Sequence, residues 1–219
     1  MPKITEVEPQ KKSPRRFNIF LDGQFAFGAD EDLVVNYRLI PGKSIEDKDL
    51  EKLLFEAEVG KLMERMYRIF SLRQRSEKEI RDYLRTLSFK RKLKGQEEIS
   101  NLAIDSLIDK LKKKEIISDE KFARAWVEAR RKSKHKGERA IRQELLQKGI
   151  NKEIIDLIFK DNTDYKEEEL AQLTLERKIK IWKSLPSLEF KKKAYDFLFR
   201  RGFDYNIIRS VVEKILKKL

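Results

Sequence analysis

The sequence contains no cysteine and only one histidine, His135. Without cysteine, disulfide bonds and thiolate metal sites are excluded, and a single histidine excludes metal sites built from several histidines. No apolar run approaches the roughly 18 residues that a membrane-spanning helix needs, and the first residues have no apolar core of a signal peptide. We therefore expect a cytoplasmic protein that has no membrane partner and uses no cofactor.

Glycine and proline are also scarce, at 8 and 5 residues, so helices should dominate. Charged residues make up 41% of the chain, against about a quarter in an average protein. The 51 basic residues outnumber the 38 acidic ones, which gives a net charge of +13. Acidic residues outnumber basic ones in residues 1–60, so the surplus lies in the rest of the chain. Such a surplus predicts a polyanionic partner: a nucleic acid, an anionic membrane surface or an acidic protein.

A short β element is predicted near the start of the chain. Apolar residues alternate with polar ones over residues 17–21 and again over 25–27, and Asp22-Gly23 between them is a strong hairpin turn. Residues 4–7 could add a strand. Asp30 or Asp32 can cap a short helix that follows.

From residue 47 onward the apolar spacing is helical. A first helix over 47–71 is followed by a capping box, from Ser76 to Glu79, that opens a second helix. Residues 88–98 are predicted to form a charged loop, after which Asn101 caps a third helix.

The stretch from Asp119 to Ile150 contains two further helices joined by a basic segment. Asp119 is the predicted N-cap of the first helix, and Gly149 is the residue that ends the second. The predicted apolar face of the first helix consists of Phe122, Ala125, Trp126 and Ala129. Four more helices are predicted. The first starts at Asn151, and the second follows a link at 161–164 whose aspartate is its cap. The third follows Pro186, and the fourth starts at Asp204.

These helices repeat along the chain. A first interval takes Gly149 to Gly202, and a second interval takes Ser76 to Gly137, Ile80 to Ile141 and Leu84 to Leu145. The first interval also separates the pairs Leu145 and Leu198, Ile150 and Phe203, Ile154 and Ile207, and Ile155 and Ile208. The sequence therefore predicts a mainly α protein of tandem three-helix repeats in an elongated, curved array, with a small N-terminal β-hairpin element. The predicted division is an N-terminal extension over 1–46 and three repeats over 47–117, 118–161 and 162–219.

The sequence shows no catalytic constellation. It has no Gly-Lys-Ser/Thr phosphate loop, and acid pairs such as Asp30 and Asp32 stand at helix starts, where capping explains them. His135, between two lysines, is expected to be a solvated loop residue. Trp126 and Trp182 fall on apolar faces, so core packing explains them better than base stacking does. We expect a protein that is not an enzyme.

Basic side chains concentrate at equivalent places in the first two repeats. Lysine and arginine suit the C-terminal end of a helix, so solvated helix ends would explain part of this pattern. Its recurrence in two repeats instead favours a surface that neutralises phosphates or pairs with acidic side chains, with a salt-sensitive affinity. The predicted binding residues are Arg73, Arg75, Arg81, Arg85, Arg124, Arg130, Arg131, Lys132, Lys134, Lys136, Arg139 and Arg142.

Three parts of the chain match a known pattern: RSEKEIRDYL at 75–84, the N-terminal FNIFLDGQFAFG, and a central set formed by Asp119, Phe122, Ala123, Trp126, Val127, Arg130, Gly137, Ile141, Glu144, Leu145, Lys148, Gly149 and Ile150. On these residues the chain resembles the RecX family, bacterial regulatory proteins that modulate the RecA recombinase. The resemblance covers essentially the whole chain. In the third repeat, Phe190 stands where the pattern has a small residue or an N-cap.

The resemblance implies three-helix modules that lie in the groove of the filament that RecA forms on single-stranded DNA. They reduce its ATP hydrolysis, block its extension or destabilise it, and so limit strand exchange. The implied partners of a monomer are the RecA filament and single-stranded DNA, reached directly or through RecA. Inhibition and assistance of RecA both stay open. The residues alone also allow a second function, that of a general basic helical DNA- or RNA-binding protein independent of RecA.

Overall fold

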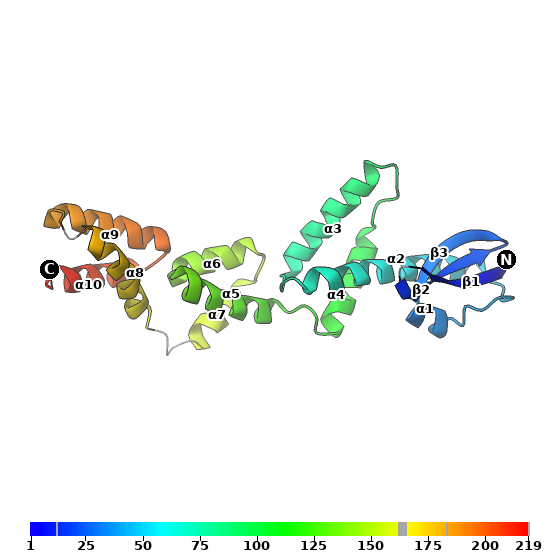
Figure 1. The fold of residues 1–219 in the computed structure, drawn as a ribbon. Coiled ribbons are helices and arrows are strands. Elements are labelled where there is room, and N and C mark those ends of the chain that lie inside the picture. The colour runs from blue at the N-terminus through cyan, green and yellow to red at the C-terminus, as the bar shows by residue number, and fades with distance from the viewer. Residues whose placement is uncertain (12, 162–165, 183, 219) are drawn as a thin grey trace. The chain divides into compact units, whose positions relative to one another are not determined.

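The structure, a computed structural model, describes residues 1–11, 13–161, 166–182 and 184–218. Over these residues three strands are followed by ten helices (Figure 1). The chain divides into two compact units. The first comprises Met1–Gln74 and Arg81–Ile116, and the second comprises Arg75–Ile80 and Ile117–Leu219. The predicted fold class, mainly α with a small N-terminal β element, is confirmed.

The first unit begins with an antiparallel sheet in the order β1-β2-β3, and its strands are β1 (Ile4–Gln10), β2 (Ser13–Leu21) and β3 (Gln24–Asp30). The predicted turn joins β2 to β3, and both of its residues are left-handed, Asp22 at φ 48° and Gly23 at φ 80°. Left-handed backbone at both central residues matches the twist of a two-residue hairpin. Asp30 then caps α1 (Glu31–Asn36), because its carboxylate accepts a 2.8 Å hydrogen bond from the Leu33 amide.

Three longer helices follow: α2 (Asp47–Phe70), α3 (Glu77–Lys92) and α4 (Asn101–Lys113). The predicted loop over 88–98 is wrong in its first part, because α3 continues to Lys92. Ser88 is buried within this helix, and its hydroxyl accepts a 2.9 Å hydrogen bond from the Ile99 amide. The charges that suggested a loop instead end a helix, where cations suit the helix dipole. The cap of α4 is Ser100 rather than Asn101, since Ser100 accepts from the Ala103 amide at 3.1 Å.

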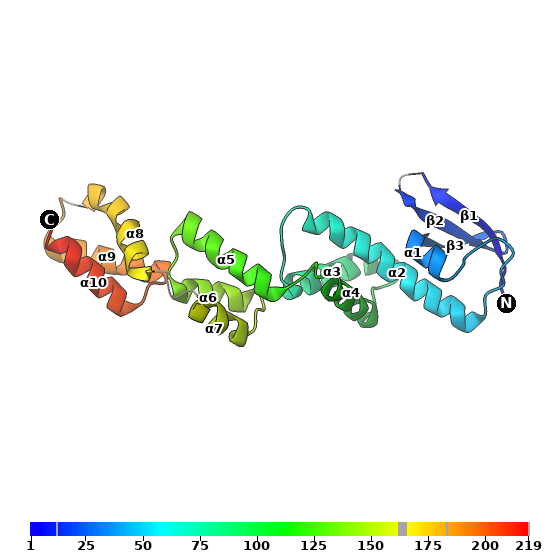
Figure 2. The same ribbon diagram turned by 90° about the horizontal axis from the view of Figure 1, so that it is seen from below.

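The second unit holds two groups of three helices, each around its own core. Figure 2 shows the last group close to the C-terminus. The predicted cap in the link at 161–164 falls on Asp161, at the end of a helix, or on Asp164, which lies outside the described residues. The helices are α5 (Asp119–Lys134), α6 (Glu138–Gln147), α7 (Lys152–Asp161), α8 (Glu167–Trp182), α9 (Ser187–Arg201) and α10 (Tyr205–Leu216).

The start of α5 differs from the prediction. Ser118 is the N-cap, and its side chain accepts a 3.2 Å hydrogen bond from the Lys121 amide. Asp119 is the first helical residue, and its carboxylate accepts from the Glu77 amide at 2.9 Å. Asp119 therefore serves the first turn of α3, a tertiary contact that local spacing does not reveal.

The apolar face of α5 is also rotated from the predicted one. Ala125 and Ala129 are exposed, and Trp126 is only half-buried. Alanine fits either side of a helix, so the predicted stripe was set by residues that do not discriminate core from surface. The buried side chains of α5 are Phe122, Ala123 and Val127.

The internal repeat is confirmed in three dimensions. The equivalent residues Leu84, Leu145 and Leu198 are each fully buried. Gly149 and Gly202 both take left-handed backbone, at φ 79° and φ 89°, and end α6 and α9. Glycine suits this position because it lacks the Cβ atom that makes left-handed backbone costly.

The third repeat keeps this pattern with a shifted start. Phe190 is 1% exposed and lies in the core of its helix group. Pro186 is the N-cap of α9, and Asp204 caps α10 as predicted, accepting from the Asn206 amide at 2.9 Å. Phe190 is thus a core residue one turn inside α9 rather than a replaced cap.

Helix ends meet twice within the second unit, in contacts between the start of one helix and the end of another. In the first helix-end contact, the Ser76 hydroxyl donates to the Lys148 carbonyl at 2.7 Å. In the second, the Gly137 amide donates to the Arg201 carbonyl at 2.9 Å and the Arg139 amide to the Gly202 carbonyl at 3.1 Å. The two sequence intervals relate Ser76 to Gly137 and Lys148 to Arg201. The same contact therefore recurs at equivalent positions.

Replacing Gly137 with alanine tests the second helix-end contact. A Cβ atom at Gly137 would lie 2.5 Å from the Gly202 carbonyl oxygen. The backbone of Gly137 is extended, at φ −73°, so alanine adds no conformational strain there. We expect Gly137→Ala to lower the free energy of unfolding by about 1–3 kcal/mol, as overpacking does, and to accelerate amide hydrogen exchange at Arg139.

Gly95→Ala is the control, because Gly95 is left-handed at φ 68° but has nothing within 4 Å of the added atom. It should cost only the left-handed strain, about 1 kcal/mol, and leave exchange at Arg139 unchanged. Wild-type exchange at Arg139 in Gly137→Ala would contradict the contact.

Candidate functional site

The predicted binding residues of the second unit do not share one role. The clearest cluster surrounds Glu144 on α6, whose side chain is 19% exposed. Trp126 and Arg130 on α5 donate to Glu144 Oε2 at 2.8 Å and 2.6 Å. Lys136, between α5 and α6, donates to Glu144 Oε1. The guanidinium of Arg130 also lies 4.0 Å from the centre of the Trp126 ring, within cation–π range.

Two of the predicted binding cations, Arg130 and Lys136, therefore hold α5 to α6. Burial raises the pKa of the Glu144 carboxyl, but the three hydrogen bonds together outweigh burial and keep the pKa below its usual value. The low pKa means that the folded chain favours the ionised carboxylate.

Arg124 and Arg142 are also engaged within this helix group. Arg124 on α5 lies 2.9 Å from Glu120 and 2.9 Å from Asp161 at the end of α7. Arg142 on α6 pairs with Glu138 on its own helix and with Asp156 on α7. Both arginines link helices of one group, and their charges are paired with acidic side chains of the same protein.

Two further arginines pack on aromatic rings. Arg131 lies 5.3 Å from the centre of the Phe159 ring. Arg139 lies 3.9 Å from the centre of the Phe199 ring and donates to the Phe199 carbonyl at 2.8 Å. Arg139 thus reinforces the second helix-end contact.

Lys132 and Lys134, near the end of α5, are exposed. No acidic side chain among the described residues pairs with either of them. Lys132 lines a groove of 630 Å³ between α5 and α8, together with Arg124, Val127, Glu128, Arg131, His135, Leu170 and Leu173. This groove gathers three of the predicted residues.

His135, in the same groove, is not the solvated loop residue that the sequence suggests. It ends α5 in left-handed backbone at φ 48°, and its buried Nδ1 has no hydrogen-bond partner among the described residues. Burial lowers the pKa of His135, and the nearby Arg177 and Arg201 lower it further. The imidazole therefore adds no positive charge to the groove at neutral pH.

Four predicted residues come from the segment around α3. Arg73 is exposed and donates to the Gln74 carbonyl at 2.9 Å. Arg75 is half-buried, and its Nε has no hydrogen-bond partner among the described residues. Arg81 pairs with Asp105 at 2.6 Å, whereas Arg85 is 70% exposed and lies 3.7 Å from Asp82. Arg85 is the most available cation of the four.

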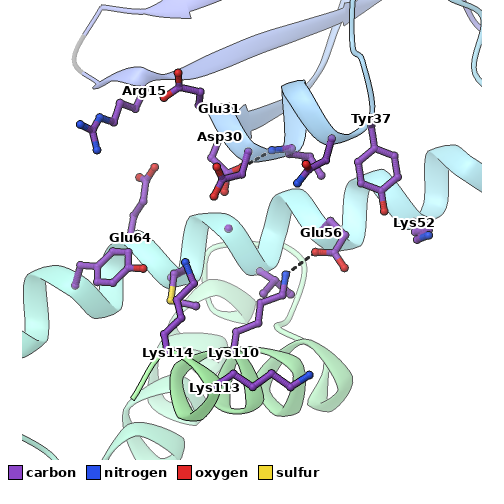
Figure 3. Close-up of a pocket in the computed structure, with 17 residues that line it drawn as sticks. Arg15, Asp30, Glu31, Tyr37, Lys52, Glu56, Glu64, Lys110, Lys113 and Lys114 are labelled. Carbon is purple, nitrogen blue, oxygen red and sulfur yellow. Dashed lines mark hydrogen bonds and ion pairs between the residues drawn. The ribbon is translucent and has the colours of Figure 1, made fainter. Parts of the chain in front are cut away.

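A second groove, of 870 Å³, runs beside α2 in the first unit (Figure 3). Asp30 lies on one side of α2, and Lys110, Lys113 and Lys114 lie on the other. Asp30 already caps α1, and Lys110 pairs with Glu56 at 2.6 Å. Since the lining mixes both signs of charge, the groove does not suit a ligand of one sign.

The role of Glu144 is not predictable from the sequence, where Glu144 belongs to the family pattern without a function of its own. The partners of Glu144 lie on another helix and in a loop, so no spacing within one helix links them.

Among the described residues, no group of three or more His, Cys, Asp or Glu is placed to hold a metal ion, and none of the described helices could cross a membrane.

Replacing Glu144 with glutamine tests the cluster. The change removes the charge that three donors share, and we expect the free energy of unfolding at pH 7 to fall by about 1–3 kcal/mol. The pKa of Glu144 is lowered by folding, so its contribution is complete above the ordinary pKa of an unfolded glutamate. That contribution is lost as the pH falls through the folded value. Urea unfolding from pH 7 to pH 3 should therefore show the two proteins converging in acid.

Glu153→Gln is the matched control. Glu153 is exposed on α7 and pairs with no basic side chain among the described residues. Its replacement should lower the free energy of unfolding at pH 7 less than Glu144→Gln does, because only its interaction with the N-terminal end of α7 is lost. A constant difference between Glu144→Gln and wild type from pH 7 to pH 3 would contradict the ionised cluster.

Comparison with known proteins now bears on the chain as a whole. Three family models match: the RecX N-terminal domain over residues 2–46, the second RecX three-helix domain over 118–157 and the third over 166–212. The regulatory protein RecX of Bacillus subtilis (strain 168) is 32% identical over 215 residues, which cover 98% of this chain and 78% of the relative. That of Listeria monocytogenes (strain EGD-e) is 30% identical over 217 residues, which cover 99% and 77%.

Solved structures agree. A crystal structure of regulatory protein RecX matches 97% of this chain and 100% of its own, with a TM-score of 0.74 and 25% identity. RecX from Lactobacillus salivarius shares the fold over 74% of this chain and 98% of its own, with a TM-score of 0.62 and 23% identity. The resemblance seen in the sequence is confirmed, and the chain belongs to the RecX family of regulatory proteins.

Proposed function

We propose that this protein binds the filament of RecA on single-stranded DNA and inhibits its ATP hydrolysis, its extension and strand exchange. The observation that carries the proposal is membership of the RecX family over 98% of the chain. The net charge of +13 supports it, because both the DNA and an acidic protein surface attract a basic partner. We also propose that the protein acts as a cytoplasmic monomer by binding and carries out no chemical reaction.

The contacts within the second unit narrow the proposed binding surface. Cations that pair with acids inside a helix group are partly neutralised, and pulling them onto a phosphate would cost those pairs. Arg124, Arg130, Lys136 and Arg142 are in this class. We therefore assign filament contact first to the exposed Lys132 and Lys134, then to Arg131, which lines the groove with Lys132, and to Arg85.

The direct test is the ATPase activity of RecA on single-stranded DNA. Adding this protein at a substoichiometric ratio should lower the steady-state rate, because one bound molecule would act on several RecA subunits of a filament. Co-sedimentation with preformed filaments should show the protein in the pellet. An unchanged rate together with protein left in the supernatant would contradict the proposal.

The groove that Lys132 and Arg131 line supports a second function, that of a general nucleic-acid-binding protein that does not depend on RecA. Such a protein would bind bare DNA or RNA tightly, with an affinity that falls steeply with salt. It would leave the RecA ATPase unchanged. Titration of bare nucleic acid at two salt concentrations, beside the ATPase assay, separates the two functions.

Charge reversal at Lys132 and Lys134 tests the narrowed surface. We expect Lys132→Glu/Lys134→Glu to weaken filament binding, because two uncompensated cations become anions. The dependence of binding on salt should fall by roughly one unit of slope for each lysine that contacts a phosphate. The melting temperature should fall only slightly, because both side chains are exposed and the change reverses only their favourable interaction with the C-terminal end of α5.

Lys217→Glu/Lys218→Glu is the control, with the same change in net charge at two exposed lysines after α10. It should bind filaments as wild type does. Equal weakening in both variants would show that only net charge matters and would contradict a local contact.

A further inference from the structure

The last helix group carries an exposed aromatic groove that the charge pattern did not predict. It lies against α9 and α10, has a volume of 790 Å³, and is lined by Pro186, Leu188, Glu189, Lys191, Lys192, Tyr195, Tyr205, Arg209 and Glu213. All of these residues belong to the second unit. None of the predicted binding residues lines it.

Two tyrosines form its aromatic part. The ring centres of Tyr195 on α9 and Tyr205 on α10 are 5.8 Å apart, and the ring planes meet at 61°. Tyr205 is 60% exposed, and Leu188 on the same groove is 82% exposed. The core of this helix group is built from other residues, with Tyr195 packed against its edge. Tyr205 therefore presents its ring to solvent without a part in the core.

The charges beside the rings are mainly basic. Lys191 Nζ lies 5.9 Å from the centre of the Tyr195 ring, and Lys192 is exposed on the next position of α9. Neither lysine pairs with an acidic side chain among the described residues. Of the two acids in the lining, Glu213 binds Arg209 at 3.1 Å and Glu189 binds Lys193 at 2.8 Å. The groove therefore has a surplus of positive charge, from Lys191 and Lys192.

We propose that this groove binds single-stranded DNA, with one base stacked on Tyr205 and the adjacent phosphates near Lys191 and Lys192. Aromatic rings beside cations are how proteins hold single strands without reading their sequence. A duplex keeps its bases stacked inside and offers none to an exposed ring, so the groove favours the single strand. This site rests on the proposed function and makes it more specific, because it gives the last helix group a direct contact with the DNA of the filament.

The experiment measures affinity of the full chain for a fluorescently labelled oligothymidine by anisotropy. We expect Tyr205→Leu to weaken binding about five-fold or more, because leucine keeps apolar bulk but has no π face. Tyr205→Phe keeps the ring and should bind as wild type does. Circular dichroism melting of each variant separates lost binding from lost fold, and an exposed first helical residue should leave the melt unchanged.

Tyr67→Leu is the matched control, since Tyr67 is a 44% exposed tyrosine in the other groove, in the first unit. It should bind oligothymidine with wild-type affinity. Wild-type affinity of Tyr205→Leu, equal weakening by Tyr67→Leu, or no binding of oligothymidine by the wild type would each overturn the DNA site. Loss of filament binding by Tyr205→Leu with unchanged oligothymidine binding would also overturn it, because the groove would then contact protein.

The RecA ATPase assay on the same proteins keeps the two proposals apart. If the wild type inhibits the RecA ATPase but Tyr205→Leu keeps wild-type affinity for DNA, only the DNA site is contradicted. Loss of DNA affinity in Tyr205→Leu, with no effect of wild type on the ATPase, supports the site while the filament function fails.

Discussion

The recurring helix-end contact is the constraint on which the second unit depends. Gly137 lies so close to Gly202 that a Cβ atom on either would meet backbone or Ala140 within 2.5 Å. The approach lets amides at the start of α6 donate to carbonyls at the end of α9. Unpaired amides and carbonyls at helix ends are costly when water is excluded, and here the two helix ends supply each other's hydrogen-bond partners. Small residues and a left-handed turn make this possible.

Side chains reinforce the same contacts and draw cations away from solvent. Arg139 packs on Phe199 at the second contact, and Lys148 pairs with Glu79 at the first. Within one helix group, Glu144 holds Arg130 and Lys136. A repeat protein of small helix groups has little core in each, so such pairs across helices add to its cohesion. A partner would therefore meet only some of the 51 basic side chains, because others pair with acids inside the protein.

The division between structural and available charge shapes the proposed function. In the second unit, some of the available cations border two grooves, Lys132 in one and Lys191 and Lys192 in the other. The groove beside Lys132 joins cations to Val127, Leu170 and Leu173, while the groove beside Lys191 and Lys192 adds aromatic rings. Together they would let one unit meet both the charge and the bases of a single strand. A partner that carries DNA and protein side by side suits such a mixed surface.

Most of the fold follows from local patterns, because hairpin turns, glycine helix ends and the spacing of Leu84, Leu145 and Leu198 act through the backbone and the nearest turn. The family also follows from the sequence. The caps at Ser100 and Ser118 were each missed by one residue, since neighbouring polar residues compete for the same role. The partners of Glu144, the contact that Asp119 makes with α3 and the exposure of Tyr205 all depend on how different helices pack together. Only the tertiary structure decided these, because spacing within one helix cannot state which other helix lies opposite.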